Sequence, residues 1–202
     1  MQRSRASGEV PVRALFLVGF MGAGKTSVGR ALAQRLSCIF EDLDDRIVGR
    51  EKRSVAEIFR DSGERAFRDV EHASLREVLA ELSSGITKIV ALGGGAFTRK
   101  RNADLLRSAR VRTVFLDAPV EELWSRCRQQ AAANGAERPL LNSMNQFRKL
   151  YASRRGAYLQ SSMIVQTAGR SIEAIASEIA RILGLPGAAD DCRTQAGPGE
   201  IE

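Results

Sequence analysis

Histidine and cysteine are almost absent from this sequence, and that shortage excludes several kinds of site. The 202 residues include one histidine, His72, and three cysteines that lie far apart in the chain. This set cannot build the usual zinc site or a disulfide framework, and a Ser-His-Asp hydrolase would have only His72 as its base. Because such sparse cysteine is typical of proteins in a reducing compartment, we expect a cytoplasmic location.

Long apolar stretches are also missing. The longest apolar run lies around 14–19, and it is much shorter than the ~20 residues that a membrane-spanning helix needs. Residues 1–13 carry charge but no apolar stretch of signal-peptide length, and residues 186–202 contain little that could be buried. We therefore expect one domain over residues 14–185, flexible termini on either side of it, and no association with a membrane.

Aromatic residues and lysine are scarce, whereas arginine is abundant. Aromatic residues make up 5% of the chain, and 26 of the 31 basic residues are arginine. The net charge of +7 would suit a nucleic-acid partner, but no basic run is interleaved with aromatic residues that could stack on bases. Arginine binds phosphate and carboxylate groups through a planar, always charged fork. The charge therefore favours a small anionic substrate and no nucleic acid, with most of the arginines simply solvated.

What is present is an alternation of β-rich and helical segments. Strands separated by helices predict parallel βαβ units and hence an α/β fold, a three-layer αβα domain. Residues 131–147 are rich in Ala, Asn and Gly and poorly periodic, which predicts a mobile lid. The predicted strands are 14–19, 38–43, 88–92, 112–116 and 162–167, and the predicted helices are 25–36, 54–59, 64–82, 99–108, 119–130 and 171–184.

The strongest chemical signal is the segment Gly19-Phe-Met-Gly-Ala-Gly-Lys-Thr26. It matches the P-loop pattern GxxxxGK[ST] and lies between a predicted strand and a predicted helix, which is the context that this motif requires. Backbone N–H groups in such a turn surround phosphate oxygens, and the helix directs its positive N-terminus at the same anion. Lys25 would reach the β- and γ-phosphates of ATP, and the Thr26 hydroxyl would ligate Mg²⁺. A chance match in a tight turn is the alternative.

Two carboxylates, Asp42 and Asp44, end the second predicted strand. Residues i and i+2 of a strand share a face, and the carboxyl ends of parallel strands lie on the same side of the sheet as the P-loop. One carboxylate could therefore hold Mg²⁺ through water while the other accepts a hydroxyl proton. The alternative is a helix N-cap, in which Asp44 or Asp45 caps a turn that begins near Arg46.

Four further patterns gain meaning only together. Arg68 and Glu71 are three residues apart on a predicted helix, so their side chains can meet, although a surface ion pair is the simpler interpretation. Three glycines, 93–95, follow the third strand and suit a close approach of a ligand or another backbone, with a flexible loop as the alternative. The last two patterns are Glu137-Arg-Pro-Leu-Leu141 in the predicted lid and Arg154-Arg-Gly-Ala-Tyr158 before the fifth strand.

These six motifs, in this order, resemble the shikimate kinase family from residue 14 to about 184. The resemblance implies a parallel sheet of order 2-3-1-4-5. It also implies transfer of the ATP γ-phosphate to the 3-hydroxyl of shikimate, on the pathway to chorismate and the aromatic amino acids. It implies ATP and shikimate as partners and Mg²⁺ as cofactor, and we expect a monomer. The alternatives are another small-metabolite kinase of the gluconate type, a nucleotide kinase, or a P-loop module that binds ATP without turnover.

The resemblance further implies a role for each motif residue. Arg68 and Arg154 would hold the substrate carboxylate, and Asp44 would take part in removing the hydroxyl proton. Position 156 is Gly where the family usually has Pro, so Arg155 is a second candidate for the carboxylate. The implied sets are catalytic Lys25, Asp44 and Arg138; ATP-binding Gly22, Ala23, Gly24, Lys25, Thr26, Ser27, Arg126 and Arg138; substrate-binding Asp44, Arg68, Glu71, Gly93, Gly94, Gly95 and Arg154; and metal-binding Thr26 and Asp42.

Overall fold

The computed structural model describes residues 14–134 and 143–184 of the chain. Its strands are β1 (Ala14–Val18), β2 (Ile39–Asp42), β3 (Lys88–Ala91), β4 (Arg112–Asp117) and β5 (Met163–Gln166). All pairings are parallel, and the strands follow one another across the sheet in the order β2-β3-β1-β4-β5. The five parallel strands and their predicted order are therefore confirmed.

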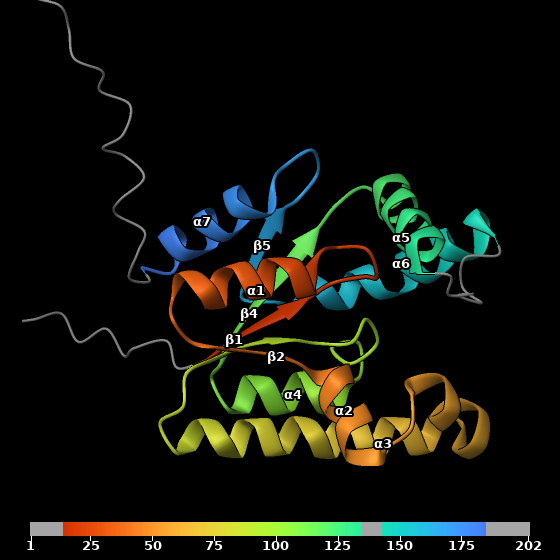
Figure 1. Cartoon of the computed structure of the whole chain (residues 1–202), viewed down its shortest axis with the longest axis horizontal. Coiled ribbons are helices and arrows are strands. Elements are labelled where there is room, and N and C mark those ends of the chain that lie inside the picture. The colour runs from red at the N-terminus through yellow and green to blue at the C-terminus, as the bar shows by residue number, and fades with distance from the viewer. Residues whose placement is uncertain (1–13, 135–142, 185–202) are drawn as a thin grey trace, which may run out of the picture.

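Helices cover both faces of this sheet. They are α1 (Lys25–Arg35), α2 (Leu43–Glu51), α3 (Val55–Ser83), α4 (Lys100–Ser108), α5 (Val120–Asn134), α6 (Met144–Tyr158) and α7 (Ile172–Ile182). Figure 1 shows α1 and α7 on one side of the sheet and α3 and α4 on the other, which confirms the three-layer αβα arrangement. Among the described residues, no helix has both the length and the apolar character that crossing a bilayer requires.

Burial on both faces of the sheet explains why the sequence of its central strand, β1, predicts a strand so clearly. All five residues of β1 are buried, because a parallel strand covered on both faces consists of a continuous apolar run. The edge strands are more exposed: Ile39 of β2 is 51% exposed and Ile164 of β5 is 44% exposed. The buried sheet fixes the carboxyl ends of the strands at one edge, and the loops at that edge form the site.

The segment after β2 differs from the expectation. The second strand ends at Asp42 and α2 begins at Leu43, so Asp42 and Asp44 do not share a strand face as we expected. Asp42 itself, rather than Asp44 or Asp45, is the N-cap: its Oδ1 accepts the backbone N–H of Asp44 at 3.1 Å. A carboxylate that satisfies a free N–H at a helix start is strongly favoured, which explains the early start of the helix.

The long helix α3 agrees with the expectation of two successive helices. Ser54 and Glu57 form the predicted capping box, with Glu57 N–H donating to Ser54 Oγ at 3.2 Å and Ser54 N–H donating to Glu57 Oε2 at 2.7 Å. Gly63 interrupts the helical backbone with φ of 79°, a left-handed value that glycine adopts without strain. The two predicted segments thus lie on either side of Gly63.

The predicted lid is only partly described. Residues 131–134 belong to the end of α5 and residues 144–147 to the start of α6, so both flanks of the predicted lid are helical. Residues 135–142, including Arg138, lie outside the described residues. The helix α6 was not predicted, and it places Arg154 on a helix packed near the site rather than in a loop.

Candidate active site

The phosphate-binding turn follows β1 and opens α1. Gly22 has φ of 79°, and a Cβ there would lie 2.7 Å from the carbonyl oxygen of Leu123, so no larger residue fits without a shift. Gly24, with φ of 86°, is the N-cap of α1, and the first N–H groups of that helix have no partner within it. Lys25 Nζ donates to the carbonyl oxygens of Gly19 and Phe20, at 2.9 Å each. This arrangement of backbone donors and a lysine is suited to an anion.

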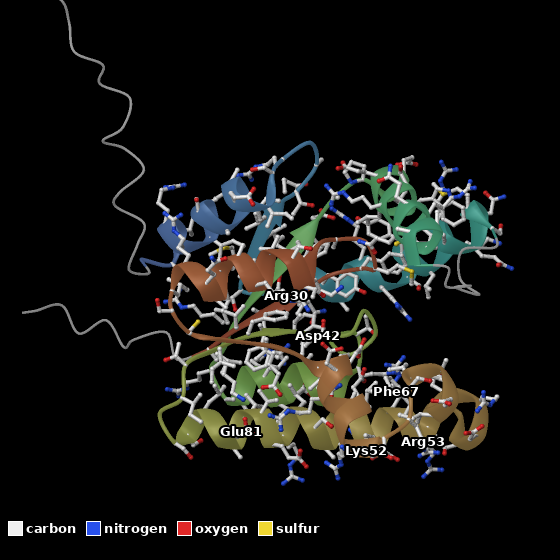
Figure 2. All side chains as sticks on the ribbon, viewed as in Figure 1. Arg30, Asp42, Lys52, Arg53, Phe67 and Glu81 are labelled. Atoms are coloured by element: carbon white, nitrogen blue, oxygen red, sulfur yellow. The ribbon has the colours of Figure 1, made fainter. Side chains whose placement is uncertain are left out.

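The acidic pair lies directly beside the turn. Thr26 Oγ1 donates to Asp42 Oδ2 at 3.0 Å, which joins the P-loop to the end of β2. Figure 2 shows Asp42 near the middle of the molecule, between the two helical layers. Asp44 points at the glycine turn, because a Cβ on Gly93 would lie 2.6 Å from its Oδ1. Lys25, Thr26, Asp42, Asp44, Gly93, Gly94 and Gln130 are among the residues that line a cavity of about 240 Å³ here.

The charges in this cavity act on one another. Burial raises the pKa of Asp44 and the neighbouring Asp42 carboxylate adds to that rise, while Lys25 and Arg68 oppose it. Burial lowers the pKa of Lys25, and the two carboxylates oppose that shift. Asp44 is therefore a stronger base than an ordinary carboxylate, and the charges of Lys25 on the P-loop and Arg68 on α3 both act on it.

The donor set suits a hard divalent cation. Within residues 14–134 and 143–184, no three His, Cys, Asp or Glu side chains gather as a metal site. Mg²⁺ in phosphate-transfer sites needs no such cluster, because one or two protein oxygens, phosphate and water complete its shell. The hydroxyl of Thr26 and the carboxylate of Asp42 supply oxygen ligands beside the P-loop and therefore fit Mg²⁺.

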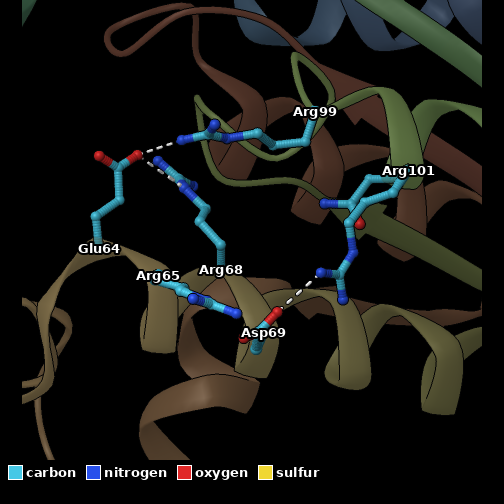
Figure 3. A pocket seen from close by; sticks show the side chains of 7 residues that line it. Glu64, Arg65, Arg68, Asp69, Arg99 and Arg101 are labelled. Carbon is cyan, nitrogen blue, oxygen red and sulfur yellow. Dashed lines mark hydrogen bonds and ion pairs between the residues drawn. The ribbon is translucent and has the colours of Figure 1, made fainter.

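An arginine on α3 faces the glycine turn from the other side. Arg68 Nη1 donates to Glu71 Oε1 at 2.8 Å, and Glu71 is 1% exposed, so this is a buried pair and not a surface one. Arg68 Nε also donates to Glu64 Oε1 at 3.3 Å, and Arg99 binds the same oxygen (Figure 3). These side chains line a second cavity, of about 570 Å³. A Cβ on Gly95 would lie 2.7 Å from Arg68 Nη2, so the glycine lets the guanidinium approach the turn.

The two neighbouring arginines of α6 have different surroundings. Arg155 donates to Asp117 Oδ2 at 2.7 Å and to the Tyr151 hydroxyl at 3.1 Å, which directs it away from the turn. Arg154 lies over the ring of Phe20 in the P-loop, with its Cζ 5.7 Å from the ring centroid. Its Nη1 lies 3.6 Å from where a Cβ of Gly94 would be. Of the two arginines, Arg154 is therefore the one whose guanidinium lies near the glycine turn.

Two further observations concern the edges of the site. Arg126 of α5 donates to the Gly22 carbonyl at 3.4 Å and to the Thr167 carbonyl at 3.0 Å, so it lies on the outer side of the P-loop. The Tyr158 hydroxyl donates to the carbonyl oxygen of Gly94 and fastens the glycine turn to α6. Tyr158 belongs to the motif before β5, where no role was expected for it, and Gln130 lines the cavity although no local sequence pattern marks it.

The structure thus brings most of the predicted residues to one edge of the sheet. The P-loop, the acidic pair and the first two glycines of the turn line one cavity, and Arg68 lines the other. Arg154 lies beside them, against Phe20 and Gly94, whereas Arg126 lies on the outer side of the P-loop and Arg138 is outside the described residues. The glycine turn is a place of close approach rather than a plain flexible loop, because side chains occupy the space that two of its missing Cβ atoms would fill.

Comparisons with known proteins point to one family. The family model described as shikimate kinase matches residues 21–183. A shikimate kinase of Geobacter sulfurreducens is 41% identical over 172 residues, covering 83% of this chain and 89% of that protein. The structure of a shikimate kinase from Acinetobacter baumannii in complex with shikimate is similar with a TM-score of 0.75 and 32% identity, over 86% of this chain and 94% of that one. A gluconokinase from Sinorhizobium meliloti, with a TM-score of 0.59, 18% identity, and coverage of 86% of this chain and 92% of its own, shares the fold alone.

Proposed function

The chain belongs to the shikimate kinase family and phosphorylates shikimate with ATP, and we propose that the 3-hydroxyl is the acceptor and the cleft around Asp44 is the place of transfer. One observation carries this proposal. The Asp44 carboxylate lies against Gly93 and interacts with Lys25 on the P-loop side and with Arg68 on the glycine-turn side. A base placed between a phosphate-binding lysine and a carboxylate-binding arginine can reach a hydroxyl group held between them.

The phosphate half of the cleft belongs to the P-loop. The N–H groups from Gly22 to Ser27 would surround the phosphates, and Lys25 would leave its two carbonyl partners for the β- and γ-phosphates. Thr26 and Asp42 would hold Mg²⁺, which when bound neutralises charge on the phosphates. Arg126, which donates to the Gly22 carbonyl on the outer side of the P-loop, would lie against the adenine.

The acceptor half belongs to the two arginines and the glycine turn. Arg68 and Arg154 approach the turn from α3 and α6, and each offers a planar fork that matches a carboxylate. Glu71 holds Arg68 from behind, so that the guanidinium keeps a fixed direction. The turn, residues 93–95, lets the substrate ring approach the backbone closely.

The acceptor hydroxyl gives up its proton to the protein as it receives the phosphoryl group from ATP. As the hydroxyl oxygen attacks the γ-phosphorus, its proton passes to Asp44, whose raised pKa suits a base better than that of an exposed carboxylate. The bond from the γ-phosphorus to the bridging oxygen of ADP breaks, and Lys25 stabilises the charge that spreads over the phosphoryl oxygens. Arg138 would join it when the segment 131–147 covers the site and excludes water.

A coupled ADP-release assay tests the acceptor. We expect turnover with shikimate and none with gluconate, AMP or CMP, and a phosphorus–proton NMR correlation should place the new phosphate on carbon 3 of the product. Preference for any of those three acceptors, or phosphate on another carbon, would contradict the proposal. The gluconate-type alternative is not favoured, because the resemblance to the gluconokinase is confined to the fold.

Two properties outside the site complete the proposal. We infer a monomer, which light scattering on the eluted protein would test against a dimer. The scarcity of cysteine supports a cytoplasmic location, where ATP and the intermediates of the shikimate pathway are available.

A further inference from the structure

One buried amide lies behind the pair formed by Arg68 and Glu71. Asn102, in the first turn of α4, is 1% exposed. Its Nδ2 donates to the carbonyl oxygen of Ala96 at 3.1 Å and to Glu71 Oε2 at 3.4 Å, and its Oδ1 lies 2.7 Å from Nδ1 of His72. Asn102 therefore joins three parts of the site: the turn after β3, the carboxylate that holds the arginine, and the neighbouring turn of α3.

The directions of these hydrogen bonds are fixed by their partners. A carbonyl oxygen and a carboxylate can only accept, so both must face the amide NH₂ group, and the opposite amide orientation would set an oxygen against each of them. The remaining Oδ1 is an acceptor, so Nδ1 of His72 must carry the proton. A chain of donors thus runs from His72 through Asn102 to Glu71, whose other oxygen accepts from Arg68 at 2.8 Å.

We propose that Asn102 is a positioning residue for acceptor binding, and that His72 keeps its amide in the working orientation. The proposal rests on the proposed role of Arg68 in binding the substrate carboxylate. Glu71 is almost fully buried, so each of its oxygens needs a partner, and a carboxylate held at both oxygens cannot rotate. The hydrogen bond to Ala96 adds a second effect: the amide of Asn102 fixes the glycine turn relative to the ion pair of Arg68 and Glu71.

The variant Asn102→Asp tests this role with little change of shape. The substitution replaces the amide donor by an oxygen that faces a carboxylate and a carbonyl, so the hydrogen bond to Glu71 is lost. Because a hydrogen bond to a charged group contributes ~1.5–3 kcal/mol, we expect the KM for shikimate to rise about ten- to a hundredfold. All three partners of Asn102 lie on α3 or in the turn after β3, so the KM for ATP should stay within about twofold.

A double variant separates positioning from a general loss of structure. In Asn102→Asp combined with Glu71→Gln, the introduced glutamine amide can donate to the introduced carboxylate, so the hydrogen bond is restored with reversed polarity. We expect a lower KM for shikimate in the double variant than in Asn102→Asp alone. If the two single effects simply multiply, Asn102 does not act through Glu71 and the proposal is wrong.

Control variants distinguish a positioning effect of Asn102 from a general loss of structure and from a wrong role for Arg68. Ser74→Ala removes a buried hydroxyl of α3, the helix of Glu71 and His72, that has no hydrogen-bond partner among the described residues, and it should leave both KM values unchanged. If Asn102→Asp does not fold, Asn102→Ser and His72→Phe decide the question, since each should raise the shikimate KM with a smaller change in melting temperature; no rise in either would overturn the proposal. If Arg68→Lys leaves the KM for shikimate unchanged, the proposed binding role of Arg68 is wrong. If Arg68→Lys raises this KM and Asn102→Asp leaves it unchanged, the binding role stands and the positioning role of Asn102 is wrong.

Discussion

Adding one methyl group to the glycine turn should damage the site in a way that depends on the position. In Gly95→Ala the new Cβ would lie 2.7 Å from Nη2 and 2.9 Å from Nη1 of Arg68. Ordinary contacts begin at 3.4 Å, so the guanidinium must move by several tenths of an ångström. The backbone itself is not strained, because Gly95 does not have a positive φ. The perturbation therefore acts on the arginine and not on the turn.

The size of the effect follows from what the displaced arginine loses. In the proposed role of Arg68, a shifted guanidinium would no longer meet the substrate carboxylate in a fork, and a charge-assisted hydrogen bond is worth ~1.5–3 kcal/mol. We expect the KM for shikimate to rise about ten- to a hundredfold, with the KM for ATP nearly unchanged. Arg68 is held by Glu71 at 2.8 Å, so it cannot yield freely without breaking that buried pair.

The neighbouring glycines provide matched variants for steady-state kinetics. In Gly93→Ala the Cβ would lie 2.6 Å from Asp44 Oδ1, so this variant should lower kcat more than it raises KM. In Gly94→Ala the nearest protein atom lies 3.6 Å from the new Cβ, so the loss of kcat/KM for shikimate should be the smallest of the three variants. If Gly95→Ala and Gly94→Ala had the same shikimate KM, the argument that these glycines make room for particular side chains would fail.

The other predictions concern single side chains. Lys25→Met should abolish turnover with an unchanged circular-dichroism spectrum, and turnover above about a tenth of the original would contradict the P-loop role. Asp44→Asn should reduce kcat with nearly unchanged ATP binding, whereas Asp42→Asn should raise the Mg²⁺ concentration needed for half-maximal rate; the same Mg²⁺ titration curve for both would refute the division between base and ligand. Arg154→Lys should raise the shikimate KM, while Arg155→Ala should chiefly lower the melting temperature because it leaves the buried Asp117 carboxylate with fewer partners; a reversed pattern would exchange their roles.

The sequence predicted the sheet well because its strands carry their signal locally. β1 is buried on both faces and is apolar throughout, and the P-loop glycines mark its end without ambiguity. The residue types and spacing of Ser54 and Glu57 alone predict a helix start, and the capping box is present as expected. Features that depend on two or three neighbouring residues could be predicted in this way.

Features that depend on competition between neighbouring residues, or on contacts between distant ones, could not be predicted from the sequence. The start of α2 was misplaced because three positions within four residues, 42, 44 and 45, all carry an aspartate that can cap a helix. The helix α6 was missed although Phe147, Leu150, Tyr151 and Tyr158 recur at helical spacing, because its first turn falls inside the predicted lid and only Phe147 and Tyr158 of its residues are fully buried. The hydrogen bond from Asn102 to Glu71 joins residues 31 positions apart, and no local pattern indicates it, in contrast to the three-residue spacing of Arg68 and Glu71.

Arg154 and Arg155 show how tertiary packing makes a choice that the motif leaves open. Successive residues of a helix point about 100° apart, so only one of the two arginines can face the glycine turn. Asp117, at the end of β4, has a side chain only 5% exposed and needs a cation, and Arg155 supplies it at 2.7 Å together with the Tyr151 hydroxyl. With Arg155 held there, α6 turns Arg154 toward Phe20 and Gly94. The arginine that faces the glycine turn is thus selected by a buried carboxylate that lies outside every motif of the site.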